Sequence, residues 1–314
     1  MPNQKKRSKN NQKTPVNRRI ADRKKDNPIL VVIASGIAIV MILFGLIVYF
    51  TASEGNRMSR HSGESEIGTM PKSGIINPAD ETASDYTESQ YGIEMVYVRG
   101  GALILGCTQE QEGDCYDYEK PSYQVTLGDF YIGKHEVTQS QWQAVMGSNS
   151  SNFMGNDLPV ENVSWEDAQE FIRKLSAATG KMYRLPTDAE WEYAARGGRK
   201  SRGYIYCGSD NVEEVAWYEG NSKNKTHSVG TKGANELGIY DMSGNVWEWC
   251  QDWSVSYSSD NQTDPMGPAF GSIRTCRGGS WVDDMQNSRS SNRRGSKPDL
   301  RVRNLGFRLA CSTN

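Results

Sequence analysis

Residues 183–197 read YRLPTDAEWEYAARG, and this stretch decides the expected fold. Thr187 and Glu190 have the spacing of a capping box, in which each side chain accepts a backbone N–H at the start of a helix. The pattern predicts a helix that begins after Thr187, runs through Trp191 and ends at Gly197-Gly198.

Two more helices are predicted upstream by the same kind of signal. Thr138 and Gln141 form a capping box before a helix that ends at Gly147. Ser164 begins another helix, which ends at Gly180 and whose apolar residues follow the 3.6-residue period. Short strands are expected at 95–98 and 123–127, and no further helix is expected beyond Arg199. The fold class is therefore α+β, with little regular secondary structure.

Charge is distributed unevenly along the 314 residues. Residues 1–27 contain ten Lys and Arg against two Asp, a net charge of +8, whereas the remainder carries −10. The basic tail runs directly into residues 29–50, which contain no charged residue and are long enough to span a bilayer core of about 30 Å. This arrangement predicts a membrane anchor rather than nucleic-acid binding, and the basic side orients the N-terminus toward the cytoplasm.

The predicted organisation has four parts. Residues 1–28 form a basic cytoplasmic tail, 29–50 a single transmembrane helix, and 51–91 a polar, flexible stalk without an apolar period. Residues 92–314 form the globular domain. The domain is expected on the periplasmic or extracellular side of the cytoplasmic (inner) membrane.

Six cysteines in a domain outside the cytoplasm are compatible with disulfides. Cys107 and Cys115, which share a polar loop, are the favoured pair. Cys276 is expected to be a disulfide partner, with Cys250 suggested as its mate. Reduced, buried cysteines are the alternative.

Eight segments together resemble the formylglycine-generating enzyme (sulfatase-modifying factor) family. They occur in family order across almost all of residues 94–310. The segments are MVYVRGG (95–101), EKP (119–121), FYIGKHEVT (130–138), LPVENVSW (158–165), YRLPTDAEWEYAARG (183–197), GIYDMSGNVWEW (238–249), RGGSW (277–281) and LGFR (305–308). The resemblance implies a variant of the C-type-lectin fold.

Much of this signature has a structural explanation. Five tryptophans are expected to fill the core and to donate their indole N–H groups to buried acceptors (Trp165, Trp191, Trp247, Trp249, Trp281). Three arginines are expected to connect loops to carboxylates such as Glu190 and Glu192 (Arg184, Arg196, Arg308). These motifs therefore predict a fold more strongly than a reaction.

The resemblance implies an oxidase that converts a cysteine of the sulfatase motif Cys-x-Pro-x-Arg to formylglycine. It also implies two copper-binding cysteines after the RGGSW segment. Asp283 and Ser288 occupy those positions, and neither can supply the thiolate that copper(I) prefers. Copper is therefore not expected, and Cys276 is only a weak candidate for a surrogate ligand.

Calcium is the favoured ion. The resemblance implies one site built from Ser243, Gly244, Val246 and the carboxylate of Glu248, which supply the oxygen ligands that Ca²⁺ prefers. A buried salt bridge made by Glu248 is the alternative. The three histidines show no metal-ligand spacing.

The missing cysteines favour a pseudoenzyme, that is, a binding or scaffold module. The predicted binding groove contains Trp281, Asp283, Ser288 and Arg289, and the expected ligand is an extended polypeptide or a glycan. A formylglycine-generating oxidoreductase and a structural component that assembles with envelope proteins are the alternatives, because a fold alone does not identify a function.

Overall fold

A computed structural model describes residues 83–111 and 115–313. The predicted cytoplasmic tail, the predicted membrane segment and most of the predicted stalk lie outside these residues. Among the helices of the described part, none is long and apolar enough to cross a membrane. The mixed helix and strand composition predicted for the globular part is confirmed.

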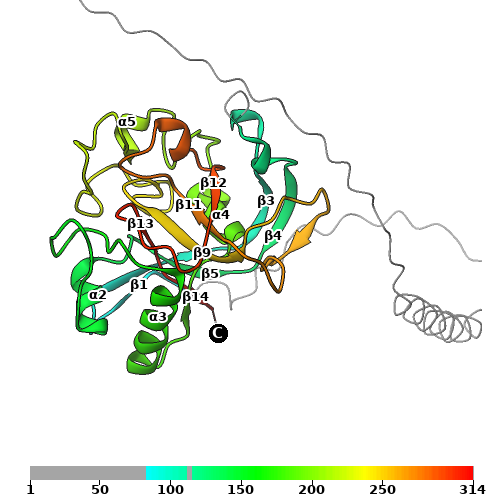
Figure 1. Cartoon of the computed structure of the whole chain (residues 1–314). Helices are drawn as coiled ribbons and strands as arrows, with labels where there is room; N and C mark the ends of the chain where they lie inside the picture. Colours follow the sequence, from blue (N-terminus) through cyan, green and yellow to red (C-terminus); the bar gives the residue numbers. More distant parts are fainter. Residues whose placement is uncertain (1–82, 112–114, 314) are drawn as a thin grey trace, which may run out of the picture. The chain divides into compact units, whose positions relative to one another are not determined.

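The domain contains many short elements joined by long loops (Figure 1). The described α-helices are α2 (Gln139–Met146), α3 (Trp165–Thr179), α4 (Asp188–Ala195) and α5 (Val212–Val215). The 3-10 turns are η2 (Gln109–Gln111), η3 (Asp117–Glu119), η4 (Gly198–Lys200) and η5 (Met285–Ser288). The strands are β1 (Tyr86–Glu88), β2 (Ile93–Val98), β3 (Gly101–Leu105), β4 (Tyr123–Leu127), β5 (Phe130–Gly133), β6 (Tyr183–Arg184), β7 (Ala216–Trp217), β8 (Ser243–Gly244), β9 (Trp247–Trp253), β10 (Gln262–Thr263), β11 (Arg274–Arg277), β12 (Arg293–Ser296), β13 (Leu305–Gly306) and β14 (Ala310–Ser312).

Four sheets are formed by strands that are distant in the sequence. The largest has the order β1-β2-β5-β14-β6, so the C-terminal strand β14 lies between β5 and β6. A four-stranded sheet has the order β12-β11-β9-β13, and β10-β4-β3 and β7-β8 form the remaining two. The sheets therefore bring the C-terminal third of the chain against its N-terminal strands.

The three predicted helices begin where their caps indicate. Thr138, Ser164 and Thr187 each accept the N3 backbone N–H, and each helix has a complete capping box. Gly147 and Gly180 end α2 and α3 with φ of 81° and 73°, a conformation that costs glycine little.

The hydrophobic core covers both faces of the five-stranded sheet. Successive side chains of a strand point to opposite faces. Accordingly, Met95 of β2 joins the cluster that contains Phe171 of α3, whereas Val96 joins the cluster that contains Trp191 of α4. The short strands are thus held between two apolar layers.

Two elements differ from the sequence predictions. β1 lies inside the predicted stalk, so the folded part begins before residue 92; β1 pairs with β2, and Tyr86 packs edge-on against Tyr131 at 5.0 Å. The single-turn helix α5 follows Arg199, where no helix was expected. Asn211 caps it, and four residues are too few to show a helical period.

Candidate functional site

The segment after β11 carries the two positions where the family resemblance implies copper-binding cysteines. β11 ends at Arg277, and Gly278 and Gly279 then turn the chain with φ of 97° and 73°. A Cβ atom on Gly279 would lie 2.7 Å from the Asn287 carbonyl oxygen, so this turn excludes a side chain. The turn leads directly to Asp283 and η5.

Asp283 acts as a hydrogen-bond acceptor. Its Oδ2 atom accepts the Trp247 indole N–H at 2.8 Å and also the Ser280 hydroxyl. Asn304 donates to the same hydroxyl at 3.0 Å, and the Asp283 carbonyl accepts the Glu219 N–H at 2.9 Å. The carboxylate therefore joins β9 to the loop after β11, and it is partly exposed.

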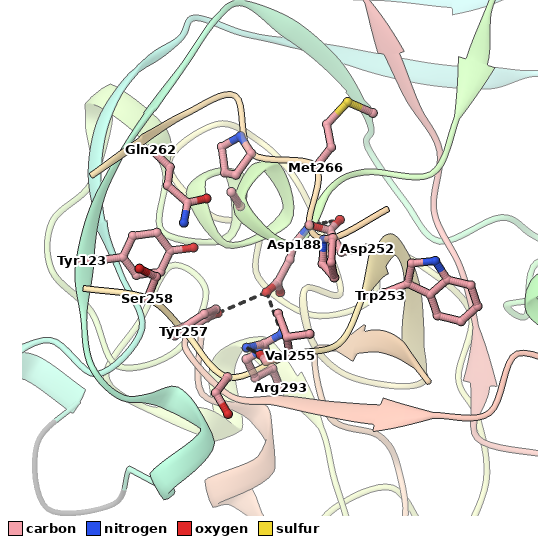
Figure 2. A pocket seen from close by; sticks show the side chains of 15 residues that line it. Tyr123, Asp188, Asp252, Trp253, Val255, Tyr257, Ser258, Gln262, Met266 and Arg293 are labelled. Carbon is pink, nitrogen blue, oxygen red and sulfur yellow. Dashed lines mark hydrogen bonds and ion pairs between the residues drawn. The ribbon is translucent and has the colours of Figure 1, made fainter. Parts of the chain in front are cut away.

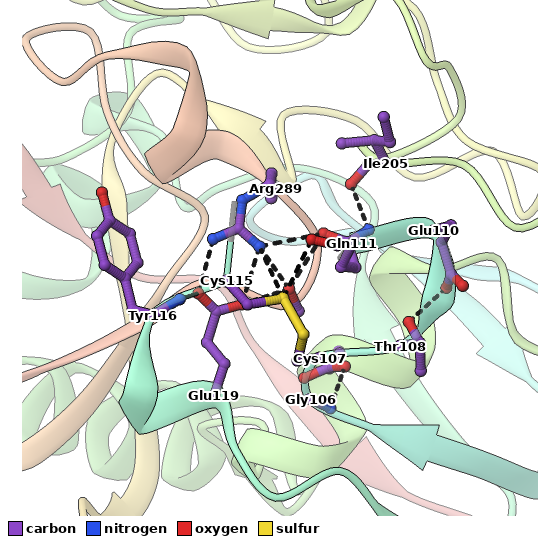
Figure 3. The surroundings of a disulfide bond; sticks show 12 residues. Gly106, Cys107, Thr108, Glu110, Gln111, Cys115, Tyr116, Glu119, Ile205 and Arg289 are labelled. Atoms are coloured by element: carbon purple, nitrogen blue, oxygen red, sulfur yellow. Dashed lines mark hydrogen bonds and ion pairs between the residues drawn. A yellow bond between two sulfur atoms is a disulfide. The ribbon is translucent and has the colours of Figure 1, made fainter. Parts of the chain in front are cut away.

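Ser288 and Arg289 are buried. The Ser288 carbonyl accepts the Ser243 hydroxyl at 2.8 Å, and within the described part of the chain the Ser288 hydroxyl has no partner. Figure 3 shows Arg289 directed at Glu119, to which it donates two hydrogen bonds of 2.9 and 2.6 Å. Burial alone would raise the pKa of Glu119, but the Arg289 and Ser291 hydrogen bonds hold that pKa below its usual range.

The four predicted groove residues therefore differ in exposure. Trp281 is also buried, with Phe153 packed edge-on against it at 5.4 Å and its indole N–H donated to the Arg303 carbonyl at 3.1 Å. Of the four, Asp283 alone reaches the surface. The prediction that Trp281, Ser288 and Arg289 line a groove is therefore wrong, because these side chains are buried in the interior. Ligand binding near Asp283 stays a prediction.

Glu248 makes the buried salt bridge that the sequence left as the alternative to calcium. Arg308 donates to both of its oxygens, with distances of 2.6 and 2.7 Å, and the Trp191 indole donates at 2.7 Å. Both charged side chains are fully buried. The carboxylate is therefore fully engaged in hydrogen bonds.

The other members of the predicted calcium set, Ser243, Gly244 and Val246, would supply backbone carbonyl oxygens. Ser243 and Gly244 form the short strand β8, and the N–H of Val246 bonds Glu136. In the described residues, no group of three or more His, Cys, Asp and Glu side chains has an arrangement suited to a metal. A calcium ion on Glu248 would also lie beside the Arg308 guanidinium, so these residues do not fit calcium in the observed arrangement.

A buried acidic cluster surrounds this salt bridge, and sequence reasoning missed it. Glu136 accepts the Val246 N–H at 3.0 Å and the Asn245 amide at 2.6 Å. Burial, followed by repulsion from Asp241 and Glu248, raises the pKa of Glu136, and burial raises the pKa of Asp241 to about 6. Both residues belong to family-like segments, but nothing in the sequence indicates that residues this far apart meet.

The cysteines are only partly as predicted. Cys107 and Cys115 form a disulfide beside η2 and η3 (Figure 3), which confirms that pair. The suggested pairing of Cys276 with Cys250 is wrong, because both are free. Cys276 is paired with Trp249 in the sheet, so the next residue, Cys250, faces the opposite core cluster. Burial raises the pKa of the Cys276 thiol to about 11.

The arginine prediction is confirmed, and the tryptophan prediction is confirmed except that Trp165 is only partly buried. Each of the five indoles donates a hydrogen bond, to Cys250, Glu248, Asp283, Val163 and Arg303 respectively in chain order. Arg184 forms a bidentate pair with Glu190, and Arg196 bonds Glu192. The structure therefore assigns most of the sequence signature to the interior of the domain.

Comparison with known proteins identifies the family. The profile of the sulfatase-modifying factor enzyme 1-like domain matches residues 81–313, which is most of the chain. The chain belongs to the sulfatase-modifying factor family.

The proteins that this chain resembles carry different functional names. Chaperone protein LppX of Paenibacillus barcinonensis is 39% identical over 235 residues, covering 57% of this chain and 80% of LppX. The formylglycine-generating enzyme of Streptomyces coelicolor is 37% identical over 192 residues, covering 55% of this chain and 59% of that enzyme. This chain thus matches less than two thirds of the enzyme. The solved structure of Treponema denticola variable protein 1 matches with a TM-score of 0.67 and 33% identity, covering 73% of this chain and 99% of that protein.

Proposed function

We propose that this sulfatase-modifying factor domain is a non-catalytic binding module, held outside the cytoplasm by the N-terminal apolar segment. One observation carries the proposal. Asp283 and Ser288 stand where the resemblance implies copper-binding cysteines, and Asp283 is instead an acceptor for Trp247 and Ser280. A carboxylate and a hydroxyl lack the soft sulfur that copper(I) requires.

The proposed ligand is a polypeptide with exposed apolar side chains. Val282 and Met285 flank the partly exposed Asp283 and are themselves 39% and 42% exposed. Met154, which follows the residue that packs on Trp281, is 68% exposed. Exposed apolar side chains that gather around a polar group are typical of protein interaction sites. The name of the relative LppX, a chaperone protein, agrees with a polypeptide ligand.

The absence of oxidase activity is tested directly. The purified full-length chain is incubated with copper(I), oxygen and a peptide containing Cys-x-Pro-x-Arg, and the peptide mass is followed over time. We expect an unchanged mass, while a formylglycine-generating enzyme assayed in parallel converts the same peptide. Formation of the aldehyde would instead support the oxidoreductase alternative and require a different metal site.

Polypeptide binding is tested with a reduced, carboxymethylated globular protein as the unfolded ligand. We expect saturable binding that falls about tenfold in Val282→Asp/Met285→Asp, because a buried charge replaces two apolar contacts. Met182→Asp is the matched control, since Met182 is 74% exposed in the turn between α3 and β6. If both variants bind equally, the ligand does not use this surface. Stoichiometric co-purification with envelope proteins without such binding would favour the structural alternative.

A further inference from the structure

A cavity lies apart from Asp283 and Ser288. It has a volume of about 340 Å³, is partly open to solvent, and is lined by the N-terminus of α4, strand β12 and the loop after β9. Figure 2 shows its side chains, among them Tyr123, Asp252, Gln262 and Arg293. Its size suits a small organic ligand, because ligand cavities in proteins begin at about 300 Å³.

The charges in and behind the wall of this cavity neutralise one another. Asp188 pairs with Arg277 at 2.5 Å and with Arg293 at 3.1 Å, and Arg277 also pairs with Glu192 at 2.9 Å. Tyr257 connects the network, since it donates to Asp188 at 3.2 Å and accepts from Arg277 at 2.8 Å. Two guanidinium groups thus balance two carboxylates, and the network presents no net charge to a ligand.

Several polar groups at the cavity remain outside this network. Tyr123, Asp252 and Arg293 are 8%, 5% and 3% exposed. Within residues 83–111 and 115–313, the buried Arg293 Nε–H has no hydrogen-bond partner. Asp252 accepts the Asp188 N–H at 2.9 Å through Oδ2, which leaves Oδ1 as an acceptor. Buried polar groups without partners are costly, so a ligand that bonds them gains affinity.

These groups include both donors and acceptors. The Gln262 amide supplies one of each and points into the cavity (Figure 2). Burial, followed by repulsion from Asp188, raises the pKa of Asp252 to about 7, so near neutral pH this carboxyl both donates and accepts. A neutral ligand whose groups both donate and accept hydrogen bonds can satisfy all of these groups.

Aromatic and apolar surfaces complete the wall. The Tyr123 and Tyr257 rings meet edge to face at 5.2 Å. Trp253 also lines the cavity, and Val255 and Met266 stand at its rim with exposures of 51% and 65%. These surfaces suit the C–H faces of a ring whose edges carry hydroxyl groups.

We propose that this cavity binds a neutral sugar ring, with hydroxyl groups bonded to Tyr123, Asp252, Gln262 and Arg293 and a C–H face against the aromatic wall. Each sugar hydroxyl both donates and accepts, which matches the mixed groups in the wall. The site is separate from the polypeptide surface near Asp283, so failure of either proposal would leave the other untouched.

The test uses the methyl glycosides of glucose, galactose, mannose and N-acetylglucosamine. Each is titrated into the purified full-length chain, and binding is followed by calorimetry and ligand-observed NMR. We expect saturable binding of at least one glycoside. Gln262→Ala and Tyr123→Phe should each weaken it up to about tenfold, the expected effect of losing one hydrogen bond.

Thr263→Ala is the matched control, because Thr263 follows Gln262 on β10 and does not line the cavity. It should bind like the wild type, and thermal unfolding must show that all three variants are folded. The proposal is overturned if none of the four glycosides binds, if folded Gln262→Ala and Tyr123→Phe bind as tightly as the wild type, or if methylammonium competes for the site. Binding of the reduced, carboxymethylated protein should be the same in Gln262→Ala as in the wild type.

Discussion

Buried arginines in this domain are each held by carboxylates from distant parts of the chain. Arg277 pairs with Asp188 and Glu192, and Arg308 pairs with Glu248. Such pairs stabilise little relative to apolar packing, but removal of one partner leaves a buried charge and costs about 3–5 kcal/mol. At these positions the family signature therefore specifies charged side chains that each need their partner to remain buried.

Sequence reasoning identified some of these residues and not others. The need of each tryptophan N–H for an acceptor is a property of the side chain, so burial and bonding could be predicted together. Arg289 was placed in a groove because it follows Ser288, yet its partner Glu119 lies 170 residues earlier. The sequence contains no signal for a pairing of that kind.

Asp252 should make the stability of the domain depend on pH. Its pKa is raised to about 7, so the folded state retains a proton that the unfolded chain releases near pH 4. The free energy of unfolding should therefore fall as pH rises from about 4 to 7, by at most about 4 kcal/mol from this residue. Asp252→Asn should remove that part of the slope in urea denaturation of the full-length chain measured at several pH values.

Other carboxyls titrate in the same range, so the difference between the wild type and the variant is the relevant quantity. Asn keeps an acceptor for the Asp188 N–H. Asp299→Asn, at an exposed position, should give a curve parallel to the wild type. An equal slope in Asp252→Asn and the wild type would show that folding does not raise the pKa of Asp252.

Helices and strands were predictable to different degrees. The starts of α2, α3 and α4 could be predicted because a capping box is a local signal contained within four residues. β1 was assigned to the stalk because three residues show no pattern without the partner strand β2. The disulfide between Cys107 and Cys115 closes a short loop, whereas the Cys250 and Cys276 suggestion failed because it required knowledge of which face of β9 each side chain occupies.

The whole chain should behave as an integral membrane protein if the N-terminal segment spans the bilayer. Alkaline carbonate washing of bacterial membranes should leave the full-length chain in the pellet, and protease added to spheroplasts should cleave the globular part. Val40→Lys/Ile42→Lys should move the chain to the supernatant, since each central lysine costs about 3 kcal/mol of insertion free energy. Ser53→Lys, outside the apolar segment, is the control. Recovery of the unaltered chain in the supernatant would contradict the anchor.

The position of β14 has a consequence for synthesis. This strand, at residues 310–312, supplies hydrogen bonds to both β5 and β6 within the largest sheet. A ribosome synthesises β14 after both β5 and β6, so the nascent domain has an open gap between these two strands until β14 emerges. Products truncated before Ala310 should therefore remain targets for quality-control proteases, because the largest sheet is complete only when β14 is present.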